Sequence, residues 1–251
     1  YGQDILPMHE NVLYIGMSSG KIMHLHQQPV NMVNSYADGK VAVLYPAGYT
    51  LARWADICAP QAGKQIQVLE LAAGIGLPSL VFQSRWNSNV TATEVAPASL
   101  NVLKNHMHRH RFEASQMQKK PTFTARRLDF TRAELRKGLL GRYDLVVSSG
   151  YGHSAAVRAE AVETARLALT NCGVYVHVEC MEKMGVVAAV ASEVFGEDSN
   201  VLDERSIPWD KHKPCELSMQ AWQVSARDCK SWPWGAAKGH SPRLTEFGCL
   251  A

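Results

Sequence analysis

Residues 68–80, VLELAAGIGLPSL, combine residue types that could bind a small ligand. An apolar run that carries an acid, Glu70, is followed by two glycines, Gly74 and Gly76, and then by a second apolar run. Glycines let the backbone turn tightly and let a ligand approach the main chain. A carboxylate beside the turn would attract a cationic group. The stretch therefore indicates a strand, a ligand-binding turn and a helix, although such turns also end strands that bind nothing.

Two further acids follow at the ends of the next two predicted strands. Glu94 closes NVTATE (89–94), and Asp129 follows FTARRL (123–128). The carboxyl ends of parallel strands meet at one edge of a sheet, where an acid after the second strand can bind a ribose diol. We therefore expect Glu70, Glu94 and Asp129 to share one site.

The chemistry of this site favours a cationic ligand that carries a ribose. A pyrophosphate prefers unopposed N–H groups and few acids, whereas three carboxylates suit S-adenosylmethionine. A dinucleotide-binding turn would have a third glycine where this chain has Ser79. A nicotinamide-dependent oxidoreductase is thus only a distant alternative.

Strand and helix patterns alternate around these residues. The expected strands are 66–71, 89–94, 123–128, 143–149 and 174–180, and the expected helices are 78–85, 97–110, 154–169 and 184–195. Alternation at this spacing forms a parallel sheet with helices on both faces. Two more β segments, near 201–206 and 217–226, follow without a crossover helix and predict a terminal antiparallel hairpin.

These patterns predict an α/β fold with a doubly wound, mostly parallel sheet of seven strands. A small β-hairpin at 12–27 precedes a helix that includes Leu51 and Trp54. We expect an N-terminal hairpin extension at 1–40, the α/β domain at 41–227 and an irregular tail at 228–251. The tail contains Trp232 and Trp234 with prolines and glycines, a composition that rarely folds alone. It is expected to lie on its own domain or on a partner protein.

The sequence resembles the seven-β-strand class I methyltransferases, and within them the protein-lysine methyltransferase branch. The stretch VLELAAGIGLPSL resembles the family's glycine motif, which lies against the methionine part of the cofactor. In TATEVAPASLNVLKNH (91–106), Glu94 stands in the place of the ribose-binding acid and Asn105 in that of a helix asparagine. The resemblance implies a Rossmann-like methyltransferase fold and S-adenosylmethionine as the cofactor.

Two other segments resemble motifs of the same family. RLDFT (127–131) resembles a Leu-Asp-Trp segment, in which Asp129 would contact the adenine amine and Phe130 would replace the tryptophan. YPAGYTLARW (45–54) resembles a Trp-Pro-Ala-Ala helix start, with Tyr45 in place of the tryptophan. The cofactor-binding residues that the resemblance implies are Glu70, Ala72, Gly74, Gly76, Glu94, Asp129 and Ser149.

The chain departs from this pattern where the methyl acceptor would lie. In YDLVVSSGYGHS (143–154), Gly150 and His153 replace an aspartate and a tyrosine of the branch. A carboxylate there would orient a lysine ammonium, which glycine cannot do. His153 is the candidate catalytic residue, as a proton acceptor near neutral pH, or else a helix cap or solvent-exposed residue. Ala72 replaces the first glycine of the turn and is strained if its φ is positive.

Two functions follow from these matches and departures. The first is S-adenosylmethionine-dependent methyl transfer, most simply to a protein side chain. The second is a catalytically inactive methyltransferase fold that serves as a structural or assembly subunit of a larger complex. The departures at Ala72, Gly150 and Tyr45 and the tail favour the second function.

Composition limits the partners and the compartment. The net charge is +3 with scattered Lys and Arg residues, which does not indicate nucleic-acid binding. Six cysteines without a CxxC pair argue against a zinc site or a dense disulfide framework and favour a reducing compartment. The first residue, Tyr1, and the basic balance suggest a mitochondrial protein, with a cytoplasmic location as the alternative.

Histidines occur in two clusters that could suggest a metal. His24 and His26 lie on one predicted strand, and His106, His108 and His110 on one predicted helix. Neither cluster includes a matched acid or cysteine, so we expect solvated histidines and no metal.

Overall fold

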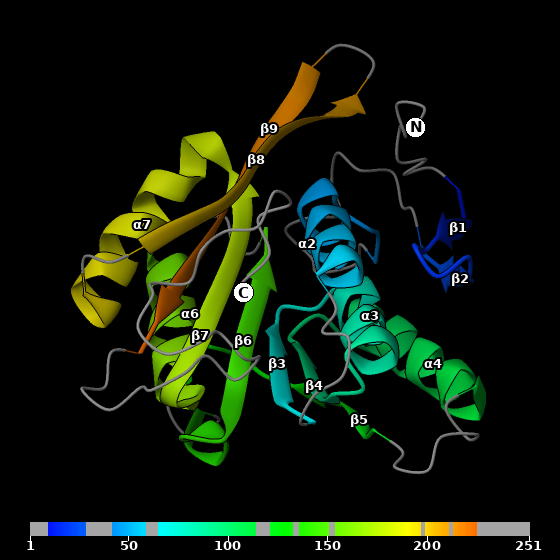
Figure 1. Ribbon diagram of the computed structural model, residues 1–251, viewed down its shortest axis with the longest axis horizontal. Coiled ribbons are helices and arrows are strands. Elements are labelled where there is room, and N and C mark those ends of the chain that lie inside the picture. Colours follow the sequence, from blue (N-terminus) through cyan, green and yellow to red (C-terminus); the bar gives the residue numbers. More distant parts are fainter. Residues whose placement is uncertain are drawn as a thin grey trace.

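The computed structural model describes residues 10–28, 42–58, 65–113, 121–132, 136–150, 154–196, 199–210 and 213–224. In this part of the chain, seven strands form one sheet in the order β5-β4-β3-β6-β7-β9-β8 (Figure 1). The strands are β3 (Gln67–Leu71), β4 (Asn89–Glu94), β5 (Phe123–Arg127), β6 (Tyr143–Ser149), β7 (Leu169–Cys180), β8 (Ser199–Asp210) and β9 (Lys213–Gln223). The first five pair in parallel, and β9 runs antiparallel to both β7 and β8. The predicted α/β fold and its terminal antiparallel hairpin are confirmed.

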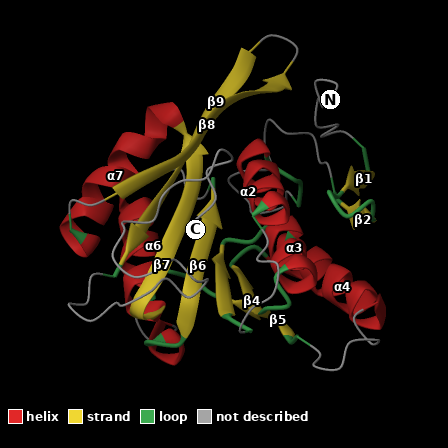
Figure 2. Ribbon diagram, in the orientation of Figure 1, coloured by secondary structure: helices red, strands yellow, loops and turns green. Residues whose placement is uncertain are grey.

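Helices cover both faces of the sheet (Figure 2). One layer contains α2 (Pro46–Ile57), α3 (Leu77–Arg85) and α4 (Pro97–Glu113), and the other contains α6 (Ala155–Ala168) and α7 (Met181–Phe195). A short 3₁₀ helix, η2 (Lys137–Leu139), precedes β6. Side chains alternate along each strand, so that Val176 of β7 belongs to one buried cluster and Tyr175 to the other. The sheet therefore separates two apolar cores.

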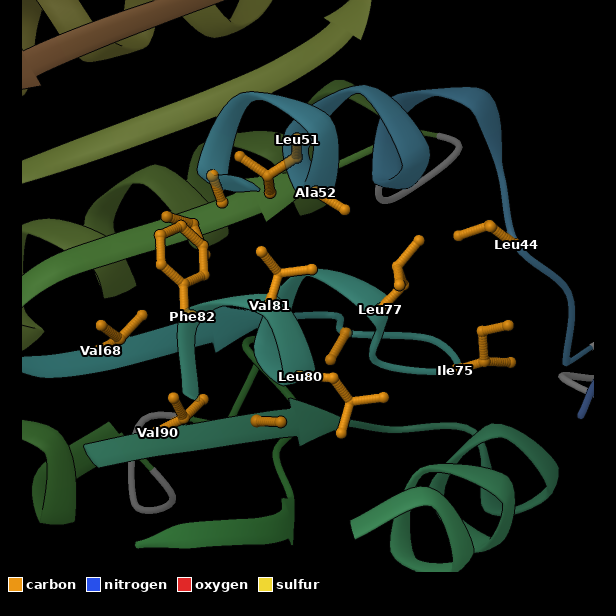
Figure 3. Close-up of a cluster of buried hydrophobic side chains, with 14 of the residues drawn as sticks. Leu44, Leu51, Ala52, Val68, Ile75, Leu77, Leu80, Val81, Phe82 and Val90 are labelled. Atoms are coloured by element: carbon orange, nitrogen blue, oxygen red, sulfur yellow. The ribbon is translucent and has the colours of Figure 1, made fainter. Parts of the chain in front are cut away.

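The core on the α2 and α3 face is densely apolar. Leu51 of α2 lies above Val81 and Phe82 of α3, which cover strands β3 and β4 (Figure 3). The rings of Trp54, Phe82 and Trp86 pack against one another with centroids 5.1–6.3 Å apart. This packing fixes the first helix after the glycine turn on the sheet.

The small N-terminal hairpin packs on the same core. Its strands β1 (Val12–Gly16) and β2 (Ile22–His26) pair antiparallel, as the sequence predicts. Inward-facing residues of both strands, such as Leu13 and Leu25, are buried with the residues of α2 and α3. Asp56 of α2 accepts hydrogen bonds from the Ser18 backbone N–H (2.6 Å), the Ser18 hydroxyl (2.9 Å) and Arg85 Nε (2.9 Å). This buried carboxylate thereby ties the hairpin turn to two helices.

Several elements differ in length from the sequence prediction. β7 begins at Leu169 rather than at 174, because the Asn-Cys-Gly stretch at 171–173 interrupts the strand as an irregularity instead of forming a separate loop. Cys172 there has a left-handed φ of +71°. β8 and β9 are longer than predicted, and they contain the paired prolines Pro208 and Pro214, which weaken a strand signal. α4 runs three residues further, to Glu113.

The bonding of the cysteines was not predicted from the sequence. Cys58 and Cys172 each take part in a disulfide bond, whereas Cys180 is a thiol. Spacing along the sequence cannot reveal such bonds, because the fold brings distant cysteines together. Among the described residues, no helix is long and apolar enough to cross a membrane.

Removing the charge of Asp56 should loosen the hairpin. We expect Asp56→Asn to lower the free energy of unfolding by about 2 kcal/mol, since hydrogen bonds to a buried charged group are strong. Urea denaturation measures this effect. The control is Asp144→Asn, at an exposed hydrogen bond to the Gln67 N–H. An equal loss of unfolding free energy in the two variants would show that the Asp56 hydrogen bonds do not stabilise the hairpin more than an exposed hydrogen bond would.

Candidate functional site

The turn between β3 and α3 has an unusual backbone. Ala72, Gly74 and Gly76 have φ values of +51°, +55° and +83°, all in the left-handed region. At Gly76 a Cβ atom would collide with the Leu103 side chain of α4, whereas at Gly74 the space is open. Gly76 is therefore required by both conformation and space, and Gly74 by conformation alone. Ala72 has the strained conformation that the sequence left as a possibility.

Glu70 connects this turn to the helix that follows. It lies on β3 and is 1% exposed. Its Oε2 accepts hydrogen bonds from the Ser79 backbone N–H (2.9 Å) and from the Ser79 hydroxyl. Gly76 at the N-cap of α3 has no side chain, so Glu70 supplies the cap from the neighbouring strand.

The second oxygen of Glu70 has different surroundings. Oε1 is buried and has no hydrogen-bond partner. Burial, with a smaller contribution from the nearby Glu94 charge, raises the pKa of Glu70 from its ordinary value of 4.5 to about 8, against the opposing hydrogen bonds of Ser79. At neutral pH the carboxyl group is therefore mostly protonated.

Glu94 holds the glycine turn from the adjacent strand. Its Oε2 accepts a hydrogen bond from the Gly74 N–H (2.9 Å). Its Oε1 accepts from the N–H groups of Val95 (2.7 Å) and Ala96 (2.9 Å). Glu94 thus contacts the glycine turn itself and Glu70 contacts the first turn of α3, with the two carboxyl groups near enough for the Glu94 charge to act on Glu70.

Asp129 has other partners. Its Oδ1 accepts hydrogen bonds from the Thr131 hydroxyl (2.7 Å) and N–H (3.1 Å), and Oδ2 lies 3.8 Å from Arg132 Nε. The Thr131 hydroxyl bond is the main cause of a lowered pKa of Asp129. About a third of its side chain is exposed, and its hydrogen bonds stay within its own loop. Of the three acids that the sequence grouped together, Glu94 contacts the glycine turn, Glu70 contacts the helix that follows it, and Asp129 bonds within its own loop.

The other predicted site residues lie at the ends of β6 and α2. Ser149 ends β6, and its hydroxyl oxygen is 3.5 Å from the position that a Cβ of Gly48 would occupy. Gly150 follows with φ +54° and donates its N–H to the Val178 carbonyl (2.9 Å). Tyr45 is the N-cap residue of α2. His153 lies outside the described residues, as do Trp232 and Trp234.

His106 is a residue that the sequence analysis misjudged. It was expected to be solvated, but its side chain is fully buried. Its Nδ1 lies 2.8 Å from the Ile75 carbonyl oxygen in the glycine turn, and its Nε2 accepts a hydrogen bond from the His26 N–H (2.8 Å). Spacing offered a signal, because His106 follows Leu103 by three residues and therefore lies close to the apolar face of α4.

A second buried polar cluster lies on the opposite face of the sheet. The Ser148 hydroxyl is 2.8 Å from both Tyr175 Oη and His177 Nδ1. Nearby on β7, Glu179 Oε2 is 3.5 Å from Arg158 Nε of α6. The Ser148 contacts join β6 to β7, and the Arg158–Glu179 ion pair joins α6 to the sheet. In the part of the chain that the structure describes, no group of three His, Cys, Asp or Glu side chains could hold a metal ion.

Comparison with solved structures gives the fold a wider context. The chain is similar to P. horikoshii TYW2 in complex with MeSAdo, with 16% identity, a TM-score of 0.55, and coverage of 86% of this chain and 73% of that one. It is also similar to M. jannaschii TYW2 in complex with AdoMet, with 17% identity, a TM-score of 0.50, and coverage of 89% and 90%. No protein-family model and no curated protein matches the sequence.

A third similar structure is the T. thermophilus 16S rRNA N2 G1207 methyltransferase RsmC in complex with AdoMet and guanosine. The identity is 16% and the TM-score 0.54, over 87% of this chain but only 46% of that one. Likeness at this level of identity establishes the fold, which is the Rossmann-like fold of S-adenosylmethionine-dependent methyltransferases. It does not carry the substrates of these proteins over to this chain.

The strain at Ala72 predicts that a glycine there would stabilise the protein. Relief of the left-handed conformation outweighs the entropy that glycine loses on folding, so Ala72→Gly should raise the free energy of unfolding by about 0.5–1 kcal/mol. The matched control is Ala73→Gly, because Ala73 is not among the residues with positive φ. Ala73→Gly should destabilise by a similar amount in the same urea titration. A loss of stability in both variants would contradict the assigned strain.

The raised pKa of Glu70 predicts a stability that depends on pH. Glu70 binds a proton more tightly in the folded state than in the unfolded state, so the contribution of Glu70 to stability falls as pH rises from about 5 to 8, by roughly 1 kcal/mol per pH unit. Glu70→Gln should remove this slope. The control Glu193→Gln, at an exposed position, should retain this slope. Urea denaturation at several pH values measures the free energy of unfolding of both variants. Identical slopes in the two variants would exclude a buried, protonated Glu70.

Proposed function

We propose that this protein binds S-adenosylmethionine at the Gly74–Gly76 turn and transfers its methyl group to a protein side chain. The observation that carries this proposal is that two buried carboxyl groups, Glu70 and Glu94, bond to the left-handed glycine turn and to the first turn of the helix that follows it. The fold and the cofactor complexes of similar structures support it. The protein side chain as acceptor rests on the resemblance of the sequence to the protein-lysine branch.

The residues at the turn fit the charge of this cofactor. Oε1 of Glu70 is buried without a partner, and after ionisation it would accept a hydrogen bond from the ammonium group of the methionine moiety. Pairing with a cation would favour the ionised form of Glu70 and lower its pKa. Glu94 Oε2 accepts one hydrogen bond, from Gly74, and keeps a lone pair for a ribose hydroxyl.

The protein's contribution to methyl transfer would be positioning. The cofactor supplies an activated methyl group on a sulfonium, and the acceptor must be neutral and aligned with it. Ser149 and Gly150 end the strand next to β3 and lie beside the start of α2. His153, three residues further, would take the acceptor's proton.

One observation favours the alternative, an inactive methyltransferase fold within a larger and possibly mitochondrial assembly. Gly150 provides no carboxylate to orient an ammonium group, and its φ of +54° disfavours larger residues. In this alternative the tail with Trp232 and Trp234 would contact the partner. Cofactor binding is common to both functions, whereas turnover belongs only to the first.

Titration calorimetry tests binding. S-adenosylmethionine should bind the wild type, Gly76→Arg should not bind it, and Glu94→Gln should bind about tenfold more weakly through loss of a charged acceptor. At pH 6.5, binding should release close to one proton, because Glu70 must ionise to pair with the ammonium. Glu193→Gln should behave like the wild type. Absence of heat with the wild type would end the proposal.

Labelled methyl transfer into a cell lysate then tests turnover. If the wild type labels protein bands that Gly76→Arg does not label, the protein is an active methyltransferase. Equal labelling by the two proteins would instead support the inactive subunit. Gly150→Asp is a further arm, since aspartate tolerates a positive φ better than most residues and its Cβ would meet Ala47 Cβ at 3.4 Å. Activity gained only in this variant would place the loss of function at Gly150.

A further inference from the structure

His106 connects two parts of the protein that are far apart in sequence. From α4 it contacts the glycine turn through Ile75 and the N-terminal hairpin through His26 of β2, each at 2.8 Å. Figure 1 shows that the hairpin lies beside α4 on the flank of the domain. Both contacts are made to backbone groups, so His106 fixes main-chain positions on both sides.

The two partners determine the protonation of the imidazole. A carbonyl oxygen only accepts and a backbone N–H only donates, so Nδ1 carries the hydrogen and Nε2 carries the lone pair. A second proton on Nε2 would face the His26 N–H. Burial, with His110, His26 and Arg109 as further contributors, lowers the pKa of His106 to about 4. The neutral ring therefore persists across the physiological range.

The hairpin has a second attachment at its other end. Asp56 holds the Ser18 turn, and His106 holds β2 at His26. The inner face of the hairpin is buried in the main core, whereas its outer face exposes Tyr14 by 67% and Ile22 by 56%. β2 is thus set relative to α2, α3 and α4, and through His106 relative to the glycine turn.

We propose that His106 is a positioning residue that links the β1–β2 hairpin to cofactor binding. The inference rests on the proposed function, and it adds that the hairpin supports the cofactor turn although it lies outside the sheet. Linkage is reciprocal: if the hairpin contact stabilises the turn that binds the cofactor, the bound cofactor must stabilise the hairpin contact.

Two substitutions separate the two contacts. The asparagine amide can reproduce the Nδ1 donor, so His106→Asn keeps the bond to Ile75 and loses the bond to His26. The glutamine amide can reproduce the Nε2 acceptor, so His106→Gln keeps the bond to His26 and loses the bond to Ile75. Calorimetry should give a dissociation constant for S-adenosylmethionine about tenfold higher in His106→Gln and about fivefold higher in His106→Asn.

Two controls exclude a general loss of stability. His108→Asn and His108→Gln make the same changes at an exposed position of α4 and should leave the dissociation constant unchanged. Val102→Ala truncates a buried residue of the same helix that belongs to the core cluster, and it should lower stability without weakening binding. If His106 had only a structural role, His106→Asn would behave like Val102→Ala: its stability would fall and its affinity for the cofactor would not change.

Hydrogen exchange at the His26 amide gives the reciprocal measurement. Saturating S-adenosylmethionine should slow this exchange several-fold in the wild type, and the effect should vanish in His106→Asn. The linkage is overturned if the wild type binds the cofactor but both His106→Asn and His106→Gln bind it as tightly as the wild type does. It is also overturned if the cofactor does not change the exchange rate at the His26 amide of the wild type. Failure of the wild type to bind would overturn the proposed function and, with it, this inference.

Discussion

The fold of the site depends on how a left-handed turn is held between β3 and α3. The positive φ of Ala72 costs free energy, and two buried carboxyl groups offset this cost by accepting backbone N–H groups of the turn and of the first turn of α3. Glu70 uses only one oxygen for this purpose, which leaves Oε1 buried without a partner in a carboxyl group whose pKa is raised. A carboxyl group that is neutral alone and charged beside a cation suits a ligand with an ammonium group. In the proposed function, the same residue thus caps a helix and binds the ligand.

Much of the fold could be predicted from the sequence because strand and helix periods alternate clearly from residue 66 to 196. The strand ends at Glu70 and Glu94 and the glycine turn were located correctly, since buried strands and glycines leave strong local signals. The long extent of β8 and β9 was not predicted, because their stability comes from pairing with each other and with β7. The tertiary structure decides whether an acidic side chain points to the glycine turn, as that of Glu94 does, or into its own loop, as that of Asp129 does.

The histidines show the same limit. His106 and His108 stand two residues apart in a polar-looking stretch, and only packing decides that one is fully buried while the other is exposed. The polar cluster of Ser148, Tyr175 and His177 was also not predicted, because its members belong to different strands and meet only in the sheet. Buried hydrogen-bonded groups of this kind constrain a fold to one arrangement, since leaving any partner unpaired is costly. Both helical layers are therefore fixed to the sheet by polar as well as apolar contacts.

The central claim is that one adenosyl sulfonium molecule binds at the Gly74–Gly76 turn. A crystal structure of the protein grown with S-adenosylmethionine tests this claim most directly. The expected result is cofactor density against the turn, with the ammonium within hydrogen-bond distance of Glu70 Oε1 and a ribose hydroxyl within that distance of Glu94. Density elsewhere, or a turn in which Glu70 Oε1 stays buried without a ligand at saturating cofactor, would contradict it.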